Sequence, residues 1–287
     1  MTLSDDVKSA LWRAFALAWL LAAAATIALM ADPALASPRH GARYSESRSG
    51  EDFHWSWKLP AGKTIEIKGV NGDIEAHAAS GDEVEVVATK HAHRSDPDEV
   101  KIEVIEHEGG VTICSVYPTP WGEPANDCSP GRGGHSHTRN NDVVVDYEVR
   151  VPKGVAFRGS TVNGGVEAEG IEGPAEAYTV NGSVRVSTGG TARASTVNGS
   201  IVASVGSASW GDELAFDTVN GTVTVDFPSG LNADFRAETV NGDIVSDFPL
   251  TVTGRFSHRH ISGTIGKGGG DLKLSTVNGD IRLRSSQ

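Results

Sequence analysis

The sequence predicts an all-β protein whose short strands stack in parallel as a β-solenoid. Three observations predict it. The tetrapeptide TVNG occurs six times, and a seventh VNG stands alone at residues 70–72. Apolar residues alternate on both sides of each motif, as in strands with one buried face. The 287-residue chain has 34 Gly but only 2 Met, a composition that favours strands and turns over helices.

The first segment is predicted to lie outside this fold. Lys8 and Arg13 precede an apolar run over residues 14–30, and a small-x-small pattern, ALA, follows at residues 34–36. This order is typical of a secretory signal peptide over residues 1–36. The run is about long enough to span a bilayer, so an uncleaved anchor is the alternative. We expect an exported protein, in the periplasm or at the cell surface, without membrane insertion after cleavage.

Residues 37–52 are polar and are expected to form a flexible tether. Residues 53–154 then carry further alternating strands around the corner at Asn71, with an insertion over residues 115–141 that is rich in Pro and Gly. The neighbouring Trp55 and Trp57 share one face of an early strand and are expected to cap the open end of the stack.

Two cysteines, Cys114 and Cys128, flank the first part of the insertion. Export would place them in an oxidising compartment, so we expect one disulfide that closes this loop. Two unpaired thiols and a two-cysteine metal site are the alternatives. Trp121 lies inside the loop, where an exposed aromatic ring is a candidate for binding.

Residues 155–287 are predicted to form the regular array. From Asn163 onward the motif asparagines are 18, 17, 22 and 21 residues apart, and a degenerate turn, HISG at residues 260–263, splits the last interval into 21 and 16. A period of about twenty residues indicates stacked repeats, each of which runs strand, Asn-Gly corner, strand. The corner residues are Asn71, Gly72, Asn163, Gly164, Asn181, Gly182, Asn198, Gly199, Asn220, Gly221, Asn241, Gly242, Asn278 and Gly279.

The corner residues are predicted to be structural. The alternation puts the Thr and Asn of each motif on the buried face and shifts by one residue after the Gly, as at a bend. If successive repeats stack at about 4.8 Å, these side chains can hydrogen-bond along the stack as a ladder. The same alternation places Phe227 and Phe248 inside, stacked on each other.

These motifs also carry a resemblance. The VNG-D-I strand pair, the VRVP strand at residues 149–152 and the run of TVNG-x-I/V repeats together resemble the bacterial exported putative-adhesin family of unknown function, whose relatives include the GIN-type head domains. The similarity extends from Phe53 to Arg284. It implies a single-stranded, right-handed parallel β-helix on the cell envelope, and it says nothing about the ligand because fold does not establish function.

Charge and motifs exclude several function classes. The formal net charge is −12, and without a basic stripe this disfavours nucleic acids as partners. The sequence contains no GxSxG, HExxH, phosphate-loop or dinucleotide motif. We therefore expect a non-catalytic protein without a cofactor, an adhesin or envelope scaffold whose partner is an envelope polysaccharide or an envelope protein, bound through the insertion.

Two alternatives remain open. Asp226 and Asp247 occupy equivalent positions on adjacent predicted turns, a spacing that would suit the carboxylate pair of a polysaccharide hydrolase or lyase. An envelope metal-binding protein is the second alternative, because His-x-His pairs on a strand project to one side. These pairs are His91 and His93, His135 and His137, and His258 and His260.

Overall fold

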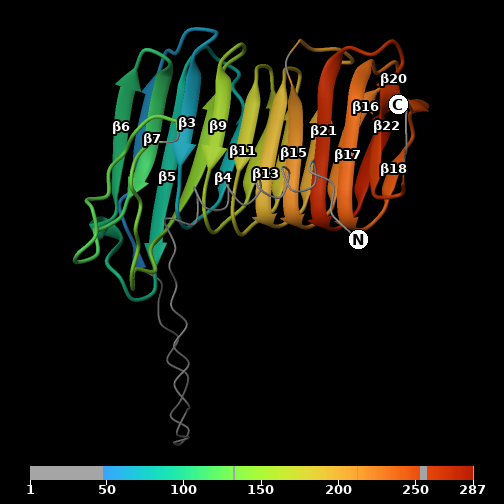
Figure 1. The fold of residues 1–287 in the computed structure, drawn as a ribbon. Helices are drawn as coiled ribbons and strands as arrows, with labels where there is room; N and C mark the ends of the chain where they lie inside the picture. Colours follow the sequence, from blue (N-terminus) through green and yellow to red (C-terminus); the bar gives the residue numbers. More distant parts are fainter. Residues whose placement is uncertain (1–47, 132, 212, 253–256, 287) are drawn as a thin grey trace, which may run out of the picture.

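The computed structural model describes residues 48–131, 133–211, 213–252 and 257–286. Over this part of the chain the regular elements are β-strands and one 3-10 turn, η1 (Pro97–Glu99). The strands form two sheets of 11 strands each, named A and B here, which face each other along the molecule (Figure 1). The all-β, solenoid-like prediction is confirmed. No helix in the described ranges is long and apolar enough to cross a bilayer.

Sheet A contains β1 (Arg48–Ser49), β2 (Phe53–Trp57), β4 (Ile74–Ala78), β5 (Val84–Ala92), β8 (Val144–Val151), β10 (Val166–Ile171), β12 (Val184–Thr188), β14 (Ile201–Val205), β16 (Val223–Pro228), β18 (Ile244–Ser246) and β22 (Ile281–Ser286). Sheet B contains β3 (Thr64–Lys68), β6 (Lys101–His107), β7 (Gly110–Val116), β9 (Ala156–Ser160), β11 (Ala175–Tyr178), β13 (Ala192–Asn198), β15 (Leu214–Asn220), β17 (Ala233–Asn241), β19 (Leu250–Val252), β20 (His260–Ile265) and β21 (Gly270–Asn278).

The repeating unit is a rung, a sheet B strand followed by a sheet A strand. Seven rungs turn at a VNG corner, and in the eighth the insertion joins the two strands. Strands of neighbouring rungs pair in parallel within each sheet. The eight rungs of the described chain are β3–β4, β7–β8, β9–β10, β11–β12, β13–β14, β15–β16, β17–β18 and β21–β22.

The rungs do not stack in sequence order, contrary to the expectation that successive repeats are neighbours. β21–β22 lies between β15–β16 and β17–β18, and in Figure 1 the red β21 stands between the orange β15 and β17. At the other end, β3–β4 lies between β7–β8 and β9–β10. At the C-terminal end the chain therefore skips one position and fills it later with β21–β22. At the N-terminal end β7–β8 is added outside β3–β4, and the chain then returns to place β9–β10 on the other side of β3–β4.

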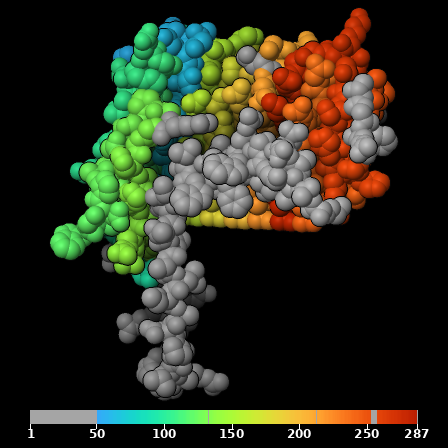
Figure 2. Space-filling view, viewed as in Figure 1, coloured from blue at the N-terminus to red at the C-terminus, as the bar shows by residue number. Residues whose placement is uncertain are grey.

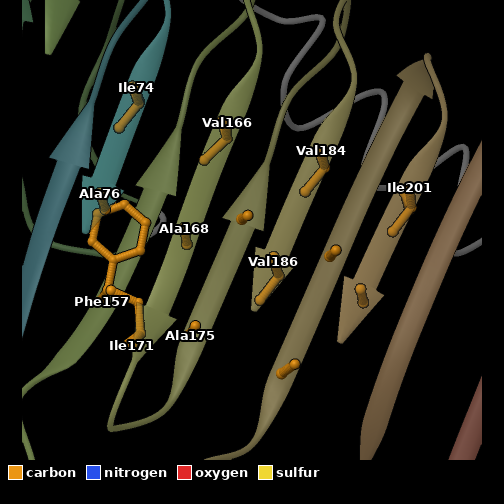
Figure 3. Packing of buried hydrophobic residues seen from close by; sticks show 14 of the residues in the cluster. Ile74, Ala76, Phe157, Val166, Ala168, Ile171, Ala175, Val184, Val186 and Ile201 are labelled. Atoms are coloured by element: carbon orange, nitrogen blue, oxygen red, sulfur yellow. The ribbon is translucent and has the colours of Figure 1, made fainter. Parts of the chain in front are cut away.

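The core is a continuous layer of small and medium apolar side chains between the sheets. Figure 3 shows Val184 and Val186 of β12 aligned with Val166 and Ala168 of β10, as the alternation predicts. Phe157, on β9 where it pairs with β3, is one of the largest fully buried side chains of this layer. No rung can bury its apolar face alone, so the stack must fold as a cooperative unit.

Antiparallel strands cover most of the two ends. At the N-terminal end β5 pairs with β8 and β6 pairs with β7, and at the C-terminal end β20 pairs with β17. The predicted turn at residues 260–263 is therefore wrong, because those residues form part of the antiparallel strand β20. Figure 2 shows the N-terminal strands in blue to green at one end and the C-terminal strands in orange to red at the other.

Other predictions concern residues at these ends. Trp55 packs against the core from β2, an edge strand of sheet A, whereas Trp57 is 51% exposed. Phe227 and Phe248 are buried as predicted, but β22 lies between β16, which carries Phe227, and β18, which precedes Phe248. Phe227 stacks instead on Trp210. Within the predicted tether, residues 48–49 form the strand β1, which pairs with β5. The predicted signal peptide lies outside the described residues.

Candidate functional site

The seven corner asparagines form one continuous ladder. The side-chain amide nitrogen of each donates to the side-chain oxygen of the asparagine before it, at 2.7–2.9 Å. The ladder begins at Asn71, whose own amide nitrogen is 3.4 Å from the carbonyl oxygen of Val143. Its order follows the stack: Asn71, Asn163, Asn181, Asn198, Asn220, Asn278 and Asn241.

The threonines form a second, buried ladder beside it. Each motif threonine donates its hydroxyl to the carbonyl oxygen of the corner glycine in the adjacent rung, at 2.8–3.1 Å. The threonines are buried as predicted, but most of the asparagines are exposed, contrary to the prediction. The alternation fails there because the chain turns at the corner and carries the asparagine outward.

Close approach of the rungs requires the corner glycines. A Cβ at Gly199 would overlap the carbonyl oxygen of Gly182 in the adjacent rung, and the other motif glycines lie equally close to a neighbouring carbonyl. Positive φ angles between +20° and +160° occur at Gly72, Gly164 and Gly279 only, among the seven motif glycines. The corner glycines are therefore required by the packing of the rungs.

The insertion is fastened to the outer face of sheet B at three points. Cys114 and Cys128 form the predicted disulfide. The ammonium group of Lys68, on β3, donates to the carbonyl oxygens of Ser129, Gly131 and Gly133 at 2.9, 3.2 and 2.6 Å. Burial lowers the pKa of Lys68, against the opposing effect of Glu66.

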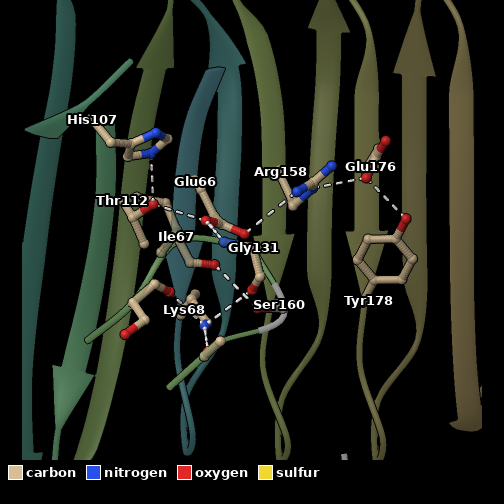
Figure 4. A network of polar contacts seen from close by, with 12 residues as sticks. Glu66, Ile67, Lys68, His107, Thr112, Gly131, Arg158, Ser160, Glu176 and Tyr178 are labelled. Carbon is tan, nitrogen blue, oxygen red and sulfur yellow. Dashed lines mark hydrogen bonds and ion pairs between the residues drawn. The ribbon is translucent and has the colours of Figure 1, made fainter. Parts of the chain in front are cut away.

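Glu66 makes the third attachment and is itself buried (Figure 4). One carboxylate oxygen accepts from the hydroxyl of Thr112 and from the backbone N–H of Gly131, both at 2.8 Å. The other lies 3.7 Å from the guanidinium of Arg158. Burial opposes the charge of Arg158, but the carboxylates of Glu176 and Glu66 outweigh it and raise its pKa. The carboxylate of Glu66 is thus compensated and fixes the loop backbone.

Within the insertion, side chains hold the backbone in one shape. Asn126 donates to the carbonyl oxygens of Tyr117 and His137 and accepts from the backbone N–H of His137. The buried hydroxyl of Tyr117 donates to the carbonyl oxygen of Val143 at 2.8 Å. Trp121 projects from this frame with its side chain fully exposed, at 101% relative accessibility. The loop therefore presents one aromatic ring to solvent from an ordered base.

The predicted carboxylate pair is not assembled. Because β22 lies between the strands that lead to Asp226 and Asp247, Arg284 stands between them. Arg284 binds Asp226 through two hydrogen bonds of 2.6 and 2.8 Å, and this pairing raises the pKa of Arg284. Asp247 accepts from the backbone N–H of Ser285. A glycoside-cleaving pair needs two carboxylates that face one sugar, and here the side chain of Arg284 is bound to one of them.

The histidine pairs each place one ring beside a carboxylate. His91 lies 3.6 Å from Asp146, His135 lies 3.1 Å from Asp127, and His260 lies 2.7 Å from Glu238. Across the described ranges, no three His, Cys, Asp or Glu side chains are grouped as metal ligands. A zinc site needs three or four protein ligands, whereas each of these rings has one carboxylate beside it.

Sequence reasoning missed Glu66 and Lys68. Both occupy outward positions of the strand TIEIK, where alternation predicts solvated charges. Their partners in the insertion are backbone atoms more than sixty residues away, and a local pattern carries no signal for such contacts.

Comparison with known proteins supports the repeat architecture. Residues 160–284 match the family model described as Toastrack DUF4097, a range that includes six of the seven corners and excludes the disulfide loop. No curated protein matches the chain. The relation to GIN-type head domains stays a prediction.

Solved structures similar to this chain include a "putative cell adhesion protein" from Clostridium sporogenes, 9% identical, which covers 82% of this chain and 100% of its own at a TM-score of 0.45. Others are a "putative adhesin" from Bacteroides fragilis (10% identity, 82% and 97% coverage, TM-score 0.26) and a "putative lipid binding protein" from Parabacteroides distasonis (13% identity, 83% and 98% coverage, TM-score 0.24).

Proposed function

We propose that this protein is a non-catalytic, exported scaffold, built as a right-handed β-solenoid, that binds an envelope polysaccharide through the disulfide-closed insertion. The observation that carries the proposal is the complete exposure of Trp121 on a loop fixed by Lys68, Glu66 and the disulfide. Exposed tryptophan on an ordered loop is a common binding element, because its ring offers a large face at little cost in conformational entropy.

Outside the insertion, the polar side chains of the corners and of the candidate carboxylate pair are bonded to other groups of the protein. The corner asparagines and threonines are engaged in ladders, and Asp226 is paired with Arg284. The disulfide fits an oxidising, exported location at the periplasm or cell surface. With a net charge of −12, a neutral polysaccharide is the favoured ligand class over an anionic polymer.

The site is tested with single tryptophan variants of residues 37–287. We expect Trp121→Ala to weaken retention on peptidoglycan or on a glycan array about tenfold or more, as removal of a central aromatic contact does. Trp57→Ala removes another exposed tryptophan and is the matched control. Equal retention of Trp121→Ala and the parent protein would refute the loop site. Binding to an envelope protein and to no carbohydrate would refute a polysaccharide as the ligand.

A second test replaces the tip of the loop and keeps the hydrogen bonds that hold the loop backbone. Tyr117, Thr119 and Asn126 hold the backbone of the loop through their side chains, so only residues 120–125 are replaced by a Gly/Ser linker. Unchanged thermal unfolding with loss of binding is the expected result. Retained binding would move the site to a solenoid face.

A further inference from the structure

The seven Asn-Gly dipeptides share a chemical liability, spontaneous deamidation. The backbone nitrogen of the glycine attacks Cγ of the asparagine, a proton passes to water, and the side-chain amide leaves as ammonia. Water then opens the resulting succinimide to aspartate or isoaspartate, so the net reaction consumes one water and releases one ammonia. Glycine permits the attack because it places no side chain beside the nucleophile.

In six of the seven motifs the attacking nitrogen is held. The backbone N–H of the glycine donates to the carbonyl oxygen of the asparagine in the adjacent rung, at 2.8–3.0 Å. Attack requires this bond to break inside a stack that is covered on both sides. The six glycines are Gly72, Gly164, Gly182, Gly199, Gly221 and Gly279.

The seventh motif, Asn241–Gly242, ends the ladder. The side chain of Asn241 donates to Asn278 at 2.8 Å, but within the described part of the chain no acceptor faces the N–H of Gly242. β20 covers β17 only as far as the bond between Thr239 N–H and the carbonyl oxygen of Arg259. Among the described residues, this cover therefore stops before the corner.

We propose that Asn241 is a site of spontaneous deamidation in the folded protein and that the other six motif asparagines are protected. Solvent exposure does not separate them, because both Asn241 and Asn278 are exposed. Local sequence does not separate them either, because both lie in TVNGDI. What differs is rung position: Asn278 lies inside the stack and Asn241 at its end. The acidic product removes the amide donor to Asn278, so modification would loosen the terminal rung.

The two identical motifs make an internal control. Tryptic cleavage after Arg236, Arg255, Lys273 and Arg282 gives peptides 237–255 and 274–282, which contain Asn241 and Asn278 respectively. After incubation of the folded full chain at mildly alkaline pH, we expect Asn241 to convert about fivefold or more faster than Asn278, a factor that one ordinary hydrogen bond supplies. In urea the two rates should converge. Equal rates in the folded protein, or a faster Asn278, would overturn the proposal.

A pair of variants tests the same point on the intact protein. The isoaspartate content after incubation, measured with an isoaspartyl methyltransferase, should fall in Asn241→Gln and stay unchanged in Asn278→Gln. Thermal unfolding of both variants shows that they fold. An unchanged signal in Asn241→Gln, or a lost signal in Asn278→Gln, would contradict the assignment.

Discussion

At the scale of single residues, each position of the corner motif has a separate physical task. The buried threonine donates to a carbonyl group of the adjacent rung, the asparagine links exposed corners, and the glycine lets two backbones approach. A carbonyl group left without a donor would destabilise the fold. A Cβ that overlaps a carbonyl oxygen would destabilise it as well. Repetition of the motif therefore reflects the same three constraints at every rung.

Gly199→Ala should destabilise the protein strongly. Its Cβ would overlap the carbonyl oxygen of Gly182, and the rungs would have to separate at a cost of about 3 kcal/mol. Gly189→Ala is the control, because open space surrounds a Cβ there, and its effect should stay within about 0.5 kcal/mol. Urea unfolding measures both, and similar losses would refute the close-approach explanation.

Asp142 should contribute to acid sensitivity. The backbone N–H of Ser95 at 2.8 Å, then the side chain of Ser95 and Arg94, lower the pKa of Asp142. A depressed carboxyl pKa contributes stability above the unfolded value of about 3.9, and that stability is lost as the pH falls through the folded pKa. Asp142→Asn should therefore flatten the decline in urea midpoint below about pH 4. Curves parallel to those of the parent protein would contradict this, and Asp52→Asn is the exposed control.

At the scale of elements, the insertion and the solenoid are separable in their stabilisation. The insertion rests on two neighbouring strands, through the disulfide to Cys114 of β7 and through backbone atoms that accept from Lys68 or donate to Glu66 of β3. The rungs beyond β11–β12 make none of these contacts among the described residues. Local loosening of the loop should therefore leave those rungs intact.

Lys68→Met should increase hydrogen exchange around residues 129–133 without changing exchange in β13–β16. The variant keeps an apolar chain but removes the donor to three carbonyl oxygens. Lys63→Met is matched to it, since Lys63 also donates to a backbone carbonyl, that of Glu108, away from the loop contacts. Exchange that rises throughout the solenoid, or equally in both variants, would show that Lys68 does not act on the loop alone.

At the scale of the whole molecule, the rung order is the least local feature. Asp217, Ser275 and Glu238 lie in one row across β15, β21 and β17. Neighbouring strands permit a disulfide, whereas two strand spacings of about 4.8 Å exceed its reach. Cysteines at 217 and 275 should therefore oxidise to a crosslink seen by mass spectrometry, and cysteines at 217 and 238 should not. The reverse result would restore sequence order.

The sequence could predict the strands, the buried face and the disulfide, because alternation and export are local signals. It could not predict that Asn278 lies between Asn220 and Asn241, since every corner presents the same surface to any other corner. For the same reason the Asp226 and Asp247 pair looked adjacent. Attachment of the insertion by Lys68 stayed hidden because its acceptors are main-chain atoms, which any sequence supplies.

The most direct measurement of the central claim is a binding screen of purified residues 37–287 against peptidoglycan, envelope polysaccharides and a glycan array, with released sugars assayed in the same wells. A non-catalytic scaffold with an exposed Trp121 should be retained on at least one carbohydrate without release of soluble products. Released sugars would contradict the non-catalytic role. Absence of retention on every carbohydrate would contradict the ligand class.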